Sequence, residues 1–381
     1  MQAETAPRIE TEIPSPIFDS IGVVGAKGQT GRLYMETVAA AFPKLPIAAI
    51  DPSERQIDFA GKVELFTDIG TVLDQEVRPE ALILATTNPT HDLFINILNH
   101  LGDKPLTLIL PQNGVDVVSE AENTFKGKNV TLIRANLFNS SVNKDDGSVF
   151  YNREQLRIGF AYVPSDPKKD EPDKEAEMQK DAAMFRQAGF DVITFGKDYE
   201  NMEWTKLVLN AMVSTGGVTG FTPEETCNDG ELYELEMKAA SDRFKILAKA
   251  GIEYQKIKWG GADLLPLLTK PGTKTLARKV ERLKKKIIKK IVEGRDNKPS
   301  GAWLNIMAGR STELRYYHQP FITLAQQYDA PRSFVDEAIL AVYKLHATGE
   351  IDLTRLEPAQ RKQLFLDTYH TLIIKAGKKT V

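Results

Sequence analysis

The stretch Ser20-Ile-Gly-Val-Val-Gly-Ala-Lys-Gly-Gln-Thr-Gly31 decides the fold of this chain. Its opening residues are mostly apolar and β-branched, which predicts a buried strand. Gly25, Gly28 and Gly31 follow in a G-x-x-G-x-x-G turn, and the pattern of residues 32–42 is typical of a helix. A strand, a glycine turn and a helix in this order predict the opening unit of a parallel α/β sheet.

The alternation of strand and helix patterns continues through the first half of the chain, and helical patterns follow in the second half. Short apolar stretches typical of strands, at 47–50, 81–85 and 106–110, alternate with helical stretches. Further strands are expected at 131–135 and 156–162, some of them antiparallel, and from about residue 202 onward apolar residues recur at helical spacing. The predicted fold class is α/β, with a flexible N-terminal tail (1–17), a Rossmann-like dinucleotide-binding domain (18–198) and an all-helical C-terminal domain (199–381).

The glycine turn is suited to the pyrophosphate of a dinucleotide. Glycine lets the backbone approach closely, and a helix that begins after the turn adds unpaired amides and the positive end of its dipole. Asp51 ends the second strand, where a carboxylate can accept hydrogen bonds from the adenosine ribose and so favours NAD. Arg55 could instead meet the 2′-phosphate of NADP, and a ligand-free tight turn is the alternative. The predicted cofactor-binding residues here are Gly25, Lys27, Gly28, Gln29, Thr30, Gly31 and Asp51.

Composition argues against several classes of function. Lys and Arg number 49 against 52 Asp and Glu, a net charge of −3, whereas a nucleic-acid-binding chain is usually strongly basic. The single cysteine, Cys227, cannot form an intramolecular disulfide, and the scattered histidines lack the spacing of a zinc site, so we expect no metal. No secretory or membrane-spanning pattern is evident, which predicts a cytoplasmic protein without a membrane partner. The basic stretch 278–298 is interpreted as a helix with a solvated face.

Three segments carry side chains suited to the reduction of a carbonyl group. Asn113 follows the strand at 106–110 and so lies at a carboxyl end of the sheet, where α/β folds bind ligands. Lys206 and Asn210 stand at i and i+4, so they share a helical face and can together protonate and orient a ketone oxygen. Glu313 is either a surface acid or a partner for a substrate hydroxyl. Taken singly, Asn113 also fits a turn asparagine, and Lys206 a solvated lysine.

In this order, the glycine turn, Gln112-Asn113-Gly114, Trp204 to Asn210 and Gly309 to Glu313 resemble the ketopantoate reductase (2-dehydropantoate 2-reductase) family. The resemblance covers about residues 18–345. It implies an NADPH-dependent enzyme that reduces ketopantoate, a 2-oxoacid, to pantoate on the pantothenate route to coenzyme A. It also implies that Lys206 is the general acid, that Asn113 and Asn210 position cofactor and substrate, and that Glu313 hydrogen-bonds the substrate hydroxyl.

The sequence departs from the family's pattern at several positions. Relatives usually have a lysine where Asn88 stands, which with Thr87 belongs to the implied cofactor site. They usually have a second asparagine where Ser214 stands in the implied substrate site. Their substrate-binding serine corresponds to Gly301, so Ser300, one place away, is the implied substrate contact in this chain.

These departures leave three hypotheses. The first is ketopantoate reduction by NADP(H), which the family favours. The second is an NAD-dependent D-2-hydroxyacid dehydrogenase of the same superfamily, which Asp51 favours because a carboxylate suits NAD(H). The third is a nucleotide-binding regulator without catalytic activity. The expected partner is a small 2-oxoacid, with a homodimer as one possible assembly.

Overall fold

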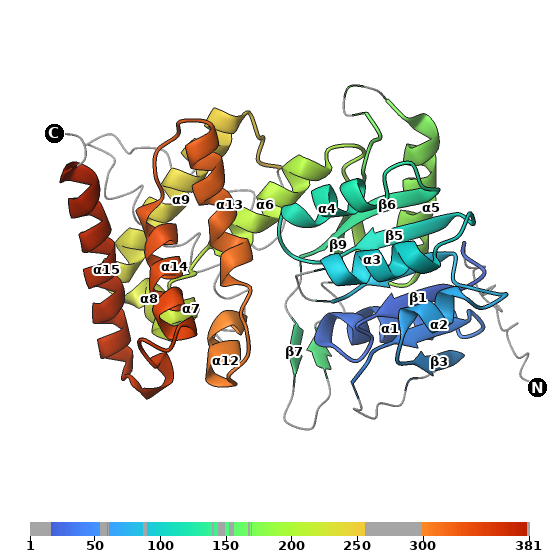
Figure 1. The fold of residues 1–381 in the computed structure, drawn as a ribbon, viewed down its shortest axis with the longest axis horizontal. Helices are drawn as coiled ribbons and strands as arrows, with labels where there is room; N and C mark the ends of the chain where they lie inside the picture. Colours follow the sequence, from blue (N-terminus) through green and yellow to red (C-terminus); the bar gives the residue numbers. More distant parts are fainter. Residues whose placement is uncertain are drawn as a thin grey trace, which may run out of the picture. The chain divides into compact units, whose positions relative to one another are not determined.

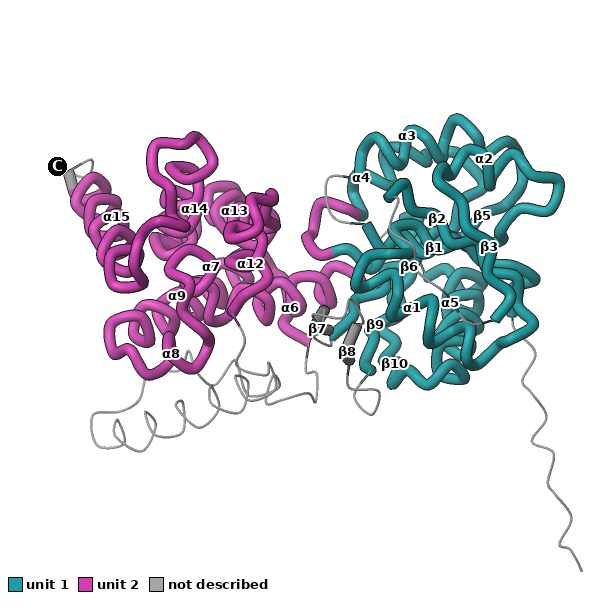
Figure 2. The backbone as a smooth tube through the Cα atoms, turned by 90° about the horizontal axis from the view of Figure 1, so that it is seen from below, with its two compact units in different colours: residues 1–112, 118–197 teal, residues 113–117, 198–381 magenta. Residues whose placement is uncertain are grey.

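The computed structural model divides the chain into two compact units, drawn in separate colours in Figure 2. Unit 1 comprises residues 1–112 and 118–197, and unit 2 comprises residues 113–117 and 198–381. The segment 113–117 thus belongs to unit 2, although the chain on either side of it belongs to unit 1. The structure describes residues 17–53, 59, 61–86, 90–138, 141–143, 149–151, 156–166, 168, 170–255 and 299–378.

Several features singled out from the sequence lie outside the described residues. They are residues 1–16 of the predicted tail, Arg55, the pair Thr87 and Asn88, and the basic stretch 278–298.

An eight-stranded sheet forms the centre of unit 1, with the order β10-β9-β6-β5-β4-β1-β2-β3. From β3 to β6 neighbouring strands are parallel, and β9 is antiparallel to β6. The strands are β1 (Ile21–Val24), β2 (Ile47–Ile50), β3 (Val63–Phe66), β4 (Ala81–Leu84), β5 (Leu106–Leu110), β6 (Val130–Leu137), β9 (Arg157–Tyr162) and β10 (Asp191–Thr194), with a separate pair β7 (Ser141–Asn143) and β8 (Val149–Tyr151). The order 3-2-1-4-5-6 within this sheet is that of dinucleotide-binding folds, so the predicted Rossmann-like fold is confirmed.

The connection of the strands positions the ligand site. The sheet grows from β1 outward to β2 and β3 on one side, and then resumes with β4 on the other side of β1. In open α/β sheets, ligands bind at the carboxyl ends of the strands where the order reverses in this way. The glycine turn follows β1 directly and therefore lies at this switch point.

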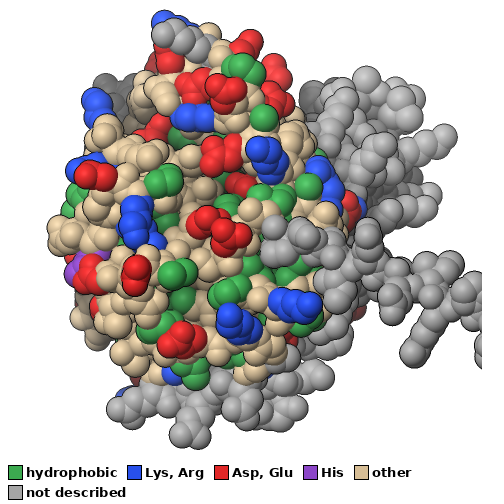
Figure 3. Space-filling view, turned by 90° about the vertical axis from the view of Figure 1, so that its right-hand side faces the viewer, with side chains coloured by type: hydrophobic (Ala, Val, Ile, Leu, Met, Phe, Trp, Pro, Cys, Tyr) green, Lys and Arg blue, Asp and Glu red, His purple; other side chains and the backbone are tan. Residues whose placement is uncertain are grey.

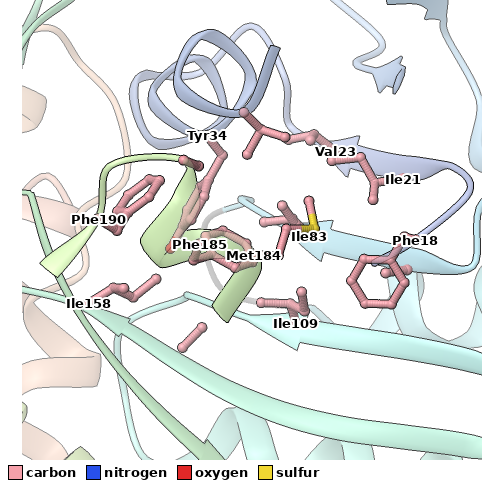
Figure 4. Packing of buried hydrophobic residues seen from close by; sticks show 14 of the residues in the cluster. Phe18, Ile21, Val23, Tyr34, Ile83, Ile109, Ile158, Met184, Phe185 and Phe190 are labelled. Atoms are coloured by element: carbon pink, nitrogen blue, oxygen red, sulfur yellow. The ribbon is translucent and has the colours of Figure 1, made fainter. Parts of the chain in front are cut away.

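Helices cover both faces of the sheet (Figures 1 and 2). Helices α1 (Gln29–Ala41) and α5 (Pro172–Gln187) share one hydrophobic core with the sheet, in which Tyr34 stacks on Phe190 with 5.7 Å between ring centroids (Figure 4). Helices α2 (Ile69–Leu73), α3 (His91–His100) and α4 (Asp116–Thr124) lie on the other face (Figure 2). Because both faces are covered, a strand such as β4 is apolar and buried at every position.

Helices make up the regular structure of the described part of unit 2. They are α6 (Tyr199–Ala211), α7 (Gly216–Thr219), α8 (Pro223–Asn228), α9 (Gly230–Ala250), α12 (Gly301–Met307), α13 (Leu314–Gln327), α14 (Phe334–Ala347), the 3₁₀ turn η3 (Leu353–Arg355) and α15 (Pro358–Lys378). Helix α13 packs against α6, α9 and α14, so the predicted all-helical domain is confirmed. Among the described helices, none combines the length and apolarity needed to cross a membrane.

One face of the molecule carries both acidic and basic side chains. On the face of the molecule drawn in Figure 3, acidic and basic side chains are interspersed with apolar ones. The described residues of this face therefore do not build the strong single-sign field that attracts a polyanion.

Candidate functional site

The glycine turn after β1 is so tight that two of its positions require glycine. Gly25 has φ = 76°, and a Cβ there would lie 2.8 Å from the carbonyl oxygen of Ala85. A Cβ on Gly31 would lie 2.1 Å from the carbonyl oxygen of Gly25, so no side chain fits between α1 and the turn. Gly28, between them, is exposed. The turn therefore presents bare backbone at the start of α1.

The N-terminus of α1 meets the conditions for binding an anionic phosphate. The helix begins at Gln29 with Gly28 as its N-cap residue, and glycine has no side chain that could accept from the first amides. The first turn of the helix contains no acidic residue. Its unpaired amides and the positive end of the helix dipole are therefore available to a phosphate. The half-buried side chains of Lys27 and Thr30 flank this backbone, and the turn as a whole fits the pyrophosphate of a dinucleotide.

Asp51 follows β2, and its buried carboxylate is bound to the glycine turn. Its Oδ2 accepts a hydrogen bond from the backbone N–H of Lys27 at 2.9 Å, and its Oδ1 accepts one from Ser53 at 3.0 Å. The Lys27 ammonium in turn donates to the carbonyl oxygen of Ser53 at 2.5 Å. A carboxylate suits the ribose hydroxyls of NAD and an ammonium suits the 2′-phosphate of NADP, so the residues at this end of β2 fit either nucleotide.

Asn113 begins the segment that leaves unit 1, and the chain before it is held by a buried arginine. Arg134 of β6 donates to the carbonyl oxygen of Leu110 at the end of β5 and, at 2.5 Å, to that of Gln112. Two residues after Asn113, Val115 packs against the core that α6, α9 and α13 form in unit 2. The backbone on both sides of Asn113 is therefore anchored, which limits the positions that its amide can take.

Lys206 and Asn210 share the one less-buried strip of α6. Between Met202 and Ala211, all residues of the helix except these two are buried, and the side chains of these two are half-buried. The amide nitrogen of Asn210 donates to the Oδ1 of Asn113 at 3.0 Å. The structure thus brings together two of the predicted catalytic residues that lie far apart in the sequence, and it presents Lys206 on the same helical face.

Glu313 joins the same group of residues through a tyrosine. It is the N-cap residue of α13, and Tyr317, one turn later, donates its phenolic hydroxyl to the Oε2 of Glu313 at 2.7 Å. The Nδ2 of Asn113 donates to the oxygen of that hydroxyl at 3.2 Å. Asn210, Asn113, Tyr317 and Glu313 therefore form one hydrogen-bonded row, and all four belong to unit 2.

Arg243 of α9 hydrogen-bonds to the C-terminal end of α6 and to the connection that follows it. This guanidinium donates to the carbonyl oxygen of Ala211 at 2.6 Å and to the hydroxyl oxygen of Ser214 at 3.4 Å. Between these two acceptors, Val213 has φ = 55°, a conformation that a β-branched residue rarely adopts. The contacts of Arg243 therefore fix the strained connection directly after Asn210.

Asp336 of α14 completes this buried cluster. It pairs with the Nη2 of Arg243 at 2.6 Å and the Nε at 3.1 Å, and it also accepts from the Nδ1 of His318 at 2.5 Å and from the Ser333 hydroxyl. The side chains of Arg243, Asp336 and His318 are all 0% exposed. Burial alone would raise the pKa of Asp336, but the charges and hydrogen bonds of Arg243 and His318 together outweigh burial and hold that pKa well below its usual range.

The two serines of the implied substrate site have structural partners. Ser214 accepts from Arg243, as described above, and is buried. Ser300 is the N-cap residue of α12, where its hydroxyl oxygen accepts from the backbone N–H of Trp303 at 3.1 Å. Both hydroxyls are therefore already used to stabilise the ends of helices.

Sequence reasoning missed Tyr317, Arg134 and Arg243. A signal was present for Arg243, because it falls on the apolar stripe of α9 between Ala239 and Ile246, and a charge on such a stripe indicates a buried partner. Arg134 likewise interrupts an apolar strand. Tyr317 carried no such signal, since its role depends on contacts with Asn113 that sequence spacing does not reveal.

Among the described residues, the arrangement of titratable side chains is not that of a metal site. In that part of the chain no group of three or more His, Cys, Asp or Glu side chains is placed to hold one.

Comparison with known proteins finds a family-model match for part of unit 2 and solved structures with a similar fold. Residues 198–343 match the family model described as ketopantoate reductase PanE/ApbA C terminal, whereas no curated protein sequence matches the chain. Among similar solved structures is a PanE/ApbA family ketopantoate reductase from Ralstonia eutropha JMP134, with 15% identity, a TM-score of 0.60, and coverage of 90% of this chain and 99% of the other.

Two further solved structures share the fold. One is a D-mandelate dehydrogenase in complex with NADH and anilino(oxo)acetate, at 12% identity, TM-score 0.63, and coverage of 87% of this chain and 100% of the other. Another is a dimeric ketopantoate reductase from Staphylococcus aureus, at 11% identity, TM-score 0.52, and coverage of 86% and 98%. At these identities the similarity to solved structures shows the fold, and the family model matches the helical region 198–343. Residues 198–343 of this chain are therefore similar to the C-terminal domain of the ketopantoate reductase PanE/ApbA family.

Proposed function

We propose that this protein is an oxidoreductase that reduces a 2-oxoacid to the corresponding 2-hydroxyacid with NADH or NADPH. The observation that supports this proposal is the row Asn210, Asn113, Tyr317 and Glu313, with Lys206 one helical turn before Asn210. An ammonium, amides and a carboxylate presented together suit a small molecule that carries a carbonyl group, a carboxylate and further polar groups.

The glycine turn and the end of β2 would hold the nucleotide. The backbone at Gly28 and Gln29 suits its pyrophosphate, and Asp51 or Lys27 suits its adenosine ribose. When bound, the nicotinamide supplies the hydride that the carbonyl carbon of the substrate receives.

Lys206 is the proposed general acid. Its ammonium gives a proton to the carbonyl oxygen as the carbon gains hydride, so that the C=O double bond is replaced by a C–O single bond, a C–H bond and an O–H bond. The positive charge of Lys206 also stabilises the developing alkoxide and attracts the substrate carboxylate. Asn210 orients the same oxygen, and its hydrogen bond to Asn113 restricts the rotation of its own amide.

Substrate recognition on this proposal depends on Lys206, Asn210 and Glu313. The hydroxyls of Ser214 and Ser300, proposed from the family resemblance, already accept hydrogen bonds from Arg243 and from the Trp303 backbone. We therefore give these two serines a supporting role at the ends of α6 and α12 rather than direct contact with the substrate.

Two substrate hypotheses follow from this site. Ketopantoate is the substrate that the family name suggests, and its reduction would place the enzyme on the route to coenzyme A. An NAD-dependent D-2-hydroxyacid dehydrogenase is the second, and it is favoured by Asp51, whose buried carboxylate lies where NAD-binding folds recognise the ribose. The bound ligands of the D-mandelate dehydrogenase, NADH and a 2-oxoacid derivative, are in keeping with this second hypothesis.

The experiment that separates these hypotheses follows the absorbance of NADH and NADPH during incubation with a panel of 2-oxoacids. Turnover of ketopantoate alone supports the first hypothesis, and turnover of other 2-oxoacids supports the second. Nucleotide binding by calorimetry, with no turnover of any 2-oxoacid, would instead favour a regulator without catalytic activity.

We also propose a cytoplasmic homodimer. The cytoplasmic location rests on the single cysteine, and the dimer rests on the dimeric Staphylococcus aureus relative. Light scattering coupled to size-exclusion chromatography tests the assembly, and a mass equal to one chain at all concentrations would contradict it.

A further inference from the structure

Tyr317 supplies Glu313 with a hydroxyl group from within the protein. The phenolic hydroxyl donates to the Oε2 of Glu313 at 2.7 Å, the short length typical of a hydroxyl bound to a carboxylate. Both residues are half-buried, so this bond is only partly screened by water. On the proposed function, Glu313 is the residue that would bind a hydroxyl group of the substrate.

The position of Tyr317 is held by more than this one bond. Glu313 and Tyr317 stand at i and i+4 at the start of α13, so their side chains project from the same helical face. The backbone N–H groups of Tyr316 and Tyr317 both donate to the carbonyl oxygen of Glu313, which orders this first turn. From the other side, the Nδ2 of Asn113 donates to the phenolic oxygen at 3.2 Å. The phenol is thus oriented toward the carboxylate by two elements of the same unit, the first turn of α13 and the segment that contains Asn113.

A carboxylate that is already paired changes how a site selects its substrate. A site that hydrogen-bonds a substrate hydroxyl rejects the analogue without that hydroxyl, because the buried protein group is then left unpaired. With Tyr317 in place, Glu313 keeps a partner whichever substrate is bound. An incoming hydroxyl gains less, because it has to displace the phenol or share the carboxylate with it.

We infer that Tyr317 is a specificity-determining residue that frees the site from the need for a substrate hydroxyl. The site then accepts 2-oxoacids whose side chains end in carbon about as readily as those whose side chains end in a hydroxyl group. This inference rests on the proposed function, and it extends the substrates of the site to 2-oxoacids that lack the hydroxyl group of ketopantoate.

The test compares two substrates that differ in a single hydroxyl. Ketopantoate is 4-hydroxy-3,3-dimethyl-2-oxobutanoate, and 3,3-dimethyl-2-oxobutanoate is the same molecule without the hydroxyl group. The quantity to measure is the ratio of kcat/KM for ketopantoate to kcat/KM for the deoxy compound, in the wild type and in Tyr317→Phe. A ratio cancels any general loss of activity that arises because Asn113 loses its acceptor in the variant.

We expect the wild type to show a ratio below about 10, because Glu313 stays paired with either substrate. In Tyr317→Phe the ratio should rise by about tenfold or more, because Glu313 is released to bind the substrate hydroxyl and is left unpaired by the deoxy compound. In the double variant Glu313→Gln/Tyr317→Phe this gain should disappear, because the charged acceptor is gone.

Tyr316→Phe is the matched control. It removes the same hydroxyl group from the adjacent residue, whose bond to Glu313 is made by its backbone. It should leave the ratio unchanged within about twofold, the scatter expected of a change outside the site. Binding of the two 2-hydroxyacid products to the protein and oxidised nucleotide, measured by calorimetry, should show the same shift without any turnover.

The outcomes separate this inference from the proposed function. A wild-type preference for ketopantoate above about a hundredfold, or a ratio that Tyr317→Phe changes by less than about threefold, would overturn the role of Tyr317 while leaving 2-oxoacid reduction intact. Failure of every 2-oxoacid to react with either nucleotide would overturn the proposed function, and the inference with it.

Discussion

Replacing Asp336 by asparagine should destabilise unit 2 more than any conservative change on its surface. The side chain is 0% exposed and is the ionic partner of Arg243, which is also 0% exposed. Asparagine has nearly the same shape, so the change removes a charge and leaves the packing almost intact. The NH₂ group of the new amide would also face donors of the guanidinium or of His318, where the carboxylate accepted from both.

The expected cost follows from burying a charge without its partner. Removing one member of a fully buried pair costs about 3–5 kcal/mol, because the remaining charge stays desolvated. A domain is typically stable by about 5–15 kcal/mol, so this loss is a large part of the total. For a unit of this size it corresponds to a decrease in Tm of roughly 6–20 °C.

Asp242→Asn is the matched control for this prediction. Asp242 lies next to Arg243 on α9 and is also buried, but its partners Lys238 and Lys245 have side chains that are 46% and 57% exposed. Pairs with such exposed lysines contribute about 1 kcal/mol or less. Urea unfolding of the wild type and both variants, followed by circular dichroism, gives the two losses under the same conditions.

The pH dependence of the unfolding free energy provides a second test of the pair between Asp336 and Arg243. The pKa of Asp336 is lowered in the folded protein, so its contribution is complete above the unfolded pKa, about 4, and is lost as pH falls through the folded value. The stability difference between wild type and Asp336→Asn should therefore be constant near neutral pH and shrink in acid. A loss below about 1 kcal/mol, or one no greater than that of Asp242→Asn, would refute the reasoning.

Three further changes have outcomes that the structure specifies. Burial raises the pKa of Asp181 to about 7, so the folded state keeps a proton that the unfolded chain releases near pH 4. The Asp181→Asn variant should therefore be more stable than the wild type by up to about 4 kcal/mol at pH 8.5, and by less at pH 5. A variant that is less stable than the wild type at pH 8.5 would contradict this prediction. Gly31→Ala places a Cβ 2.1 Å from the carbonyl oxygen of Gly25 and should cost about 1–3 kcal/mol and abolish nucleotide binding measured by fluorescence titration, while Gly230→Ala, where no heavy atom lies within 4 Å of the added Cβ, should bind as the wild type does. Lys206→Ala should lower kcat by about 10² to 10⁴-fold through loss of the proposed proton donor, and full kcat in this variant would remove Lys206 from that role.

The glycine turn and most strands were predictable because their signals are local. Apolar runs such as residues 47–50 and 106–110 coincide with β2 and β5, and the helix after the turn occurs where the pattern indicated it. The strands β3 and β10 escaped prediction. Both lie at the edges of the sheet, β3 exposes Glu64 and Leu65, and neither carries a continuous apolar run.

Part of the candidate site also follows from local spacing. The interval between Lys206 and Asn210 places them on one face of a helix whatever the rest of the chain does. The interval between Glu313 and Tyr317 would have paired those two residues by the same rule, had the start of α13 been located. The sequence could not predict which of these helical faces contact each other, because no spacing rule relates Asn113 to a helix that begins at Leu314.

By itself, then, the sequence determined the period of each element, the glycine turn, the small net charge and the polar residues available for chemistry. Tertiary structure decided which of those residues are partners: Asn113 with Asn210 and Tyr317, and Arg243 with Asp336. The physical reason is that secondary structure depends on neighbours within a few residues, whereas hydrogen bonds and ion pairs depend on distances of about 3 Å. Such distances between residues remote in sequence are set by how whole helices and strands pack.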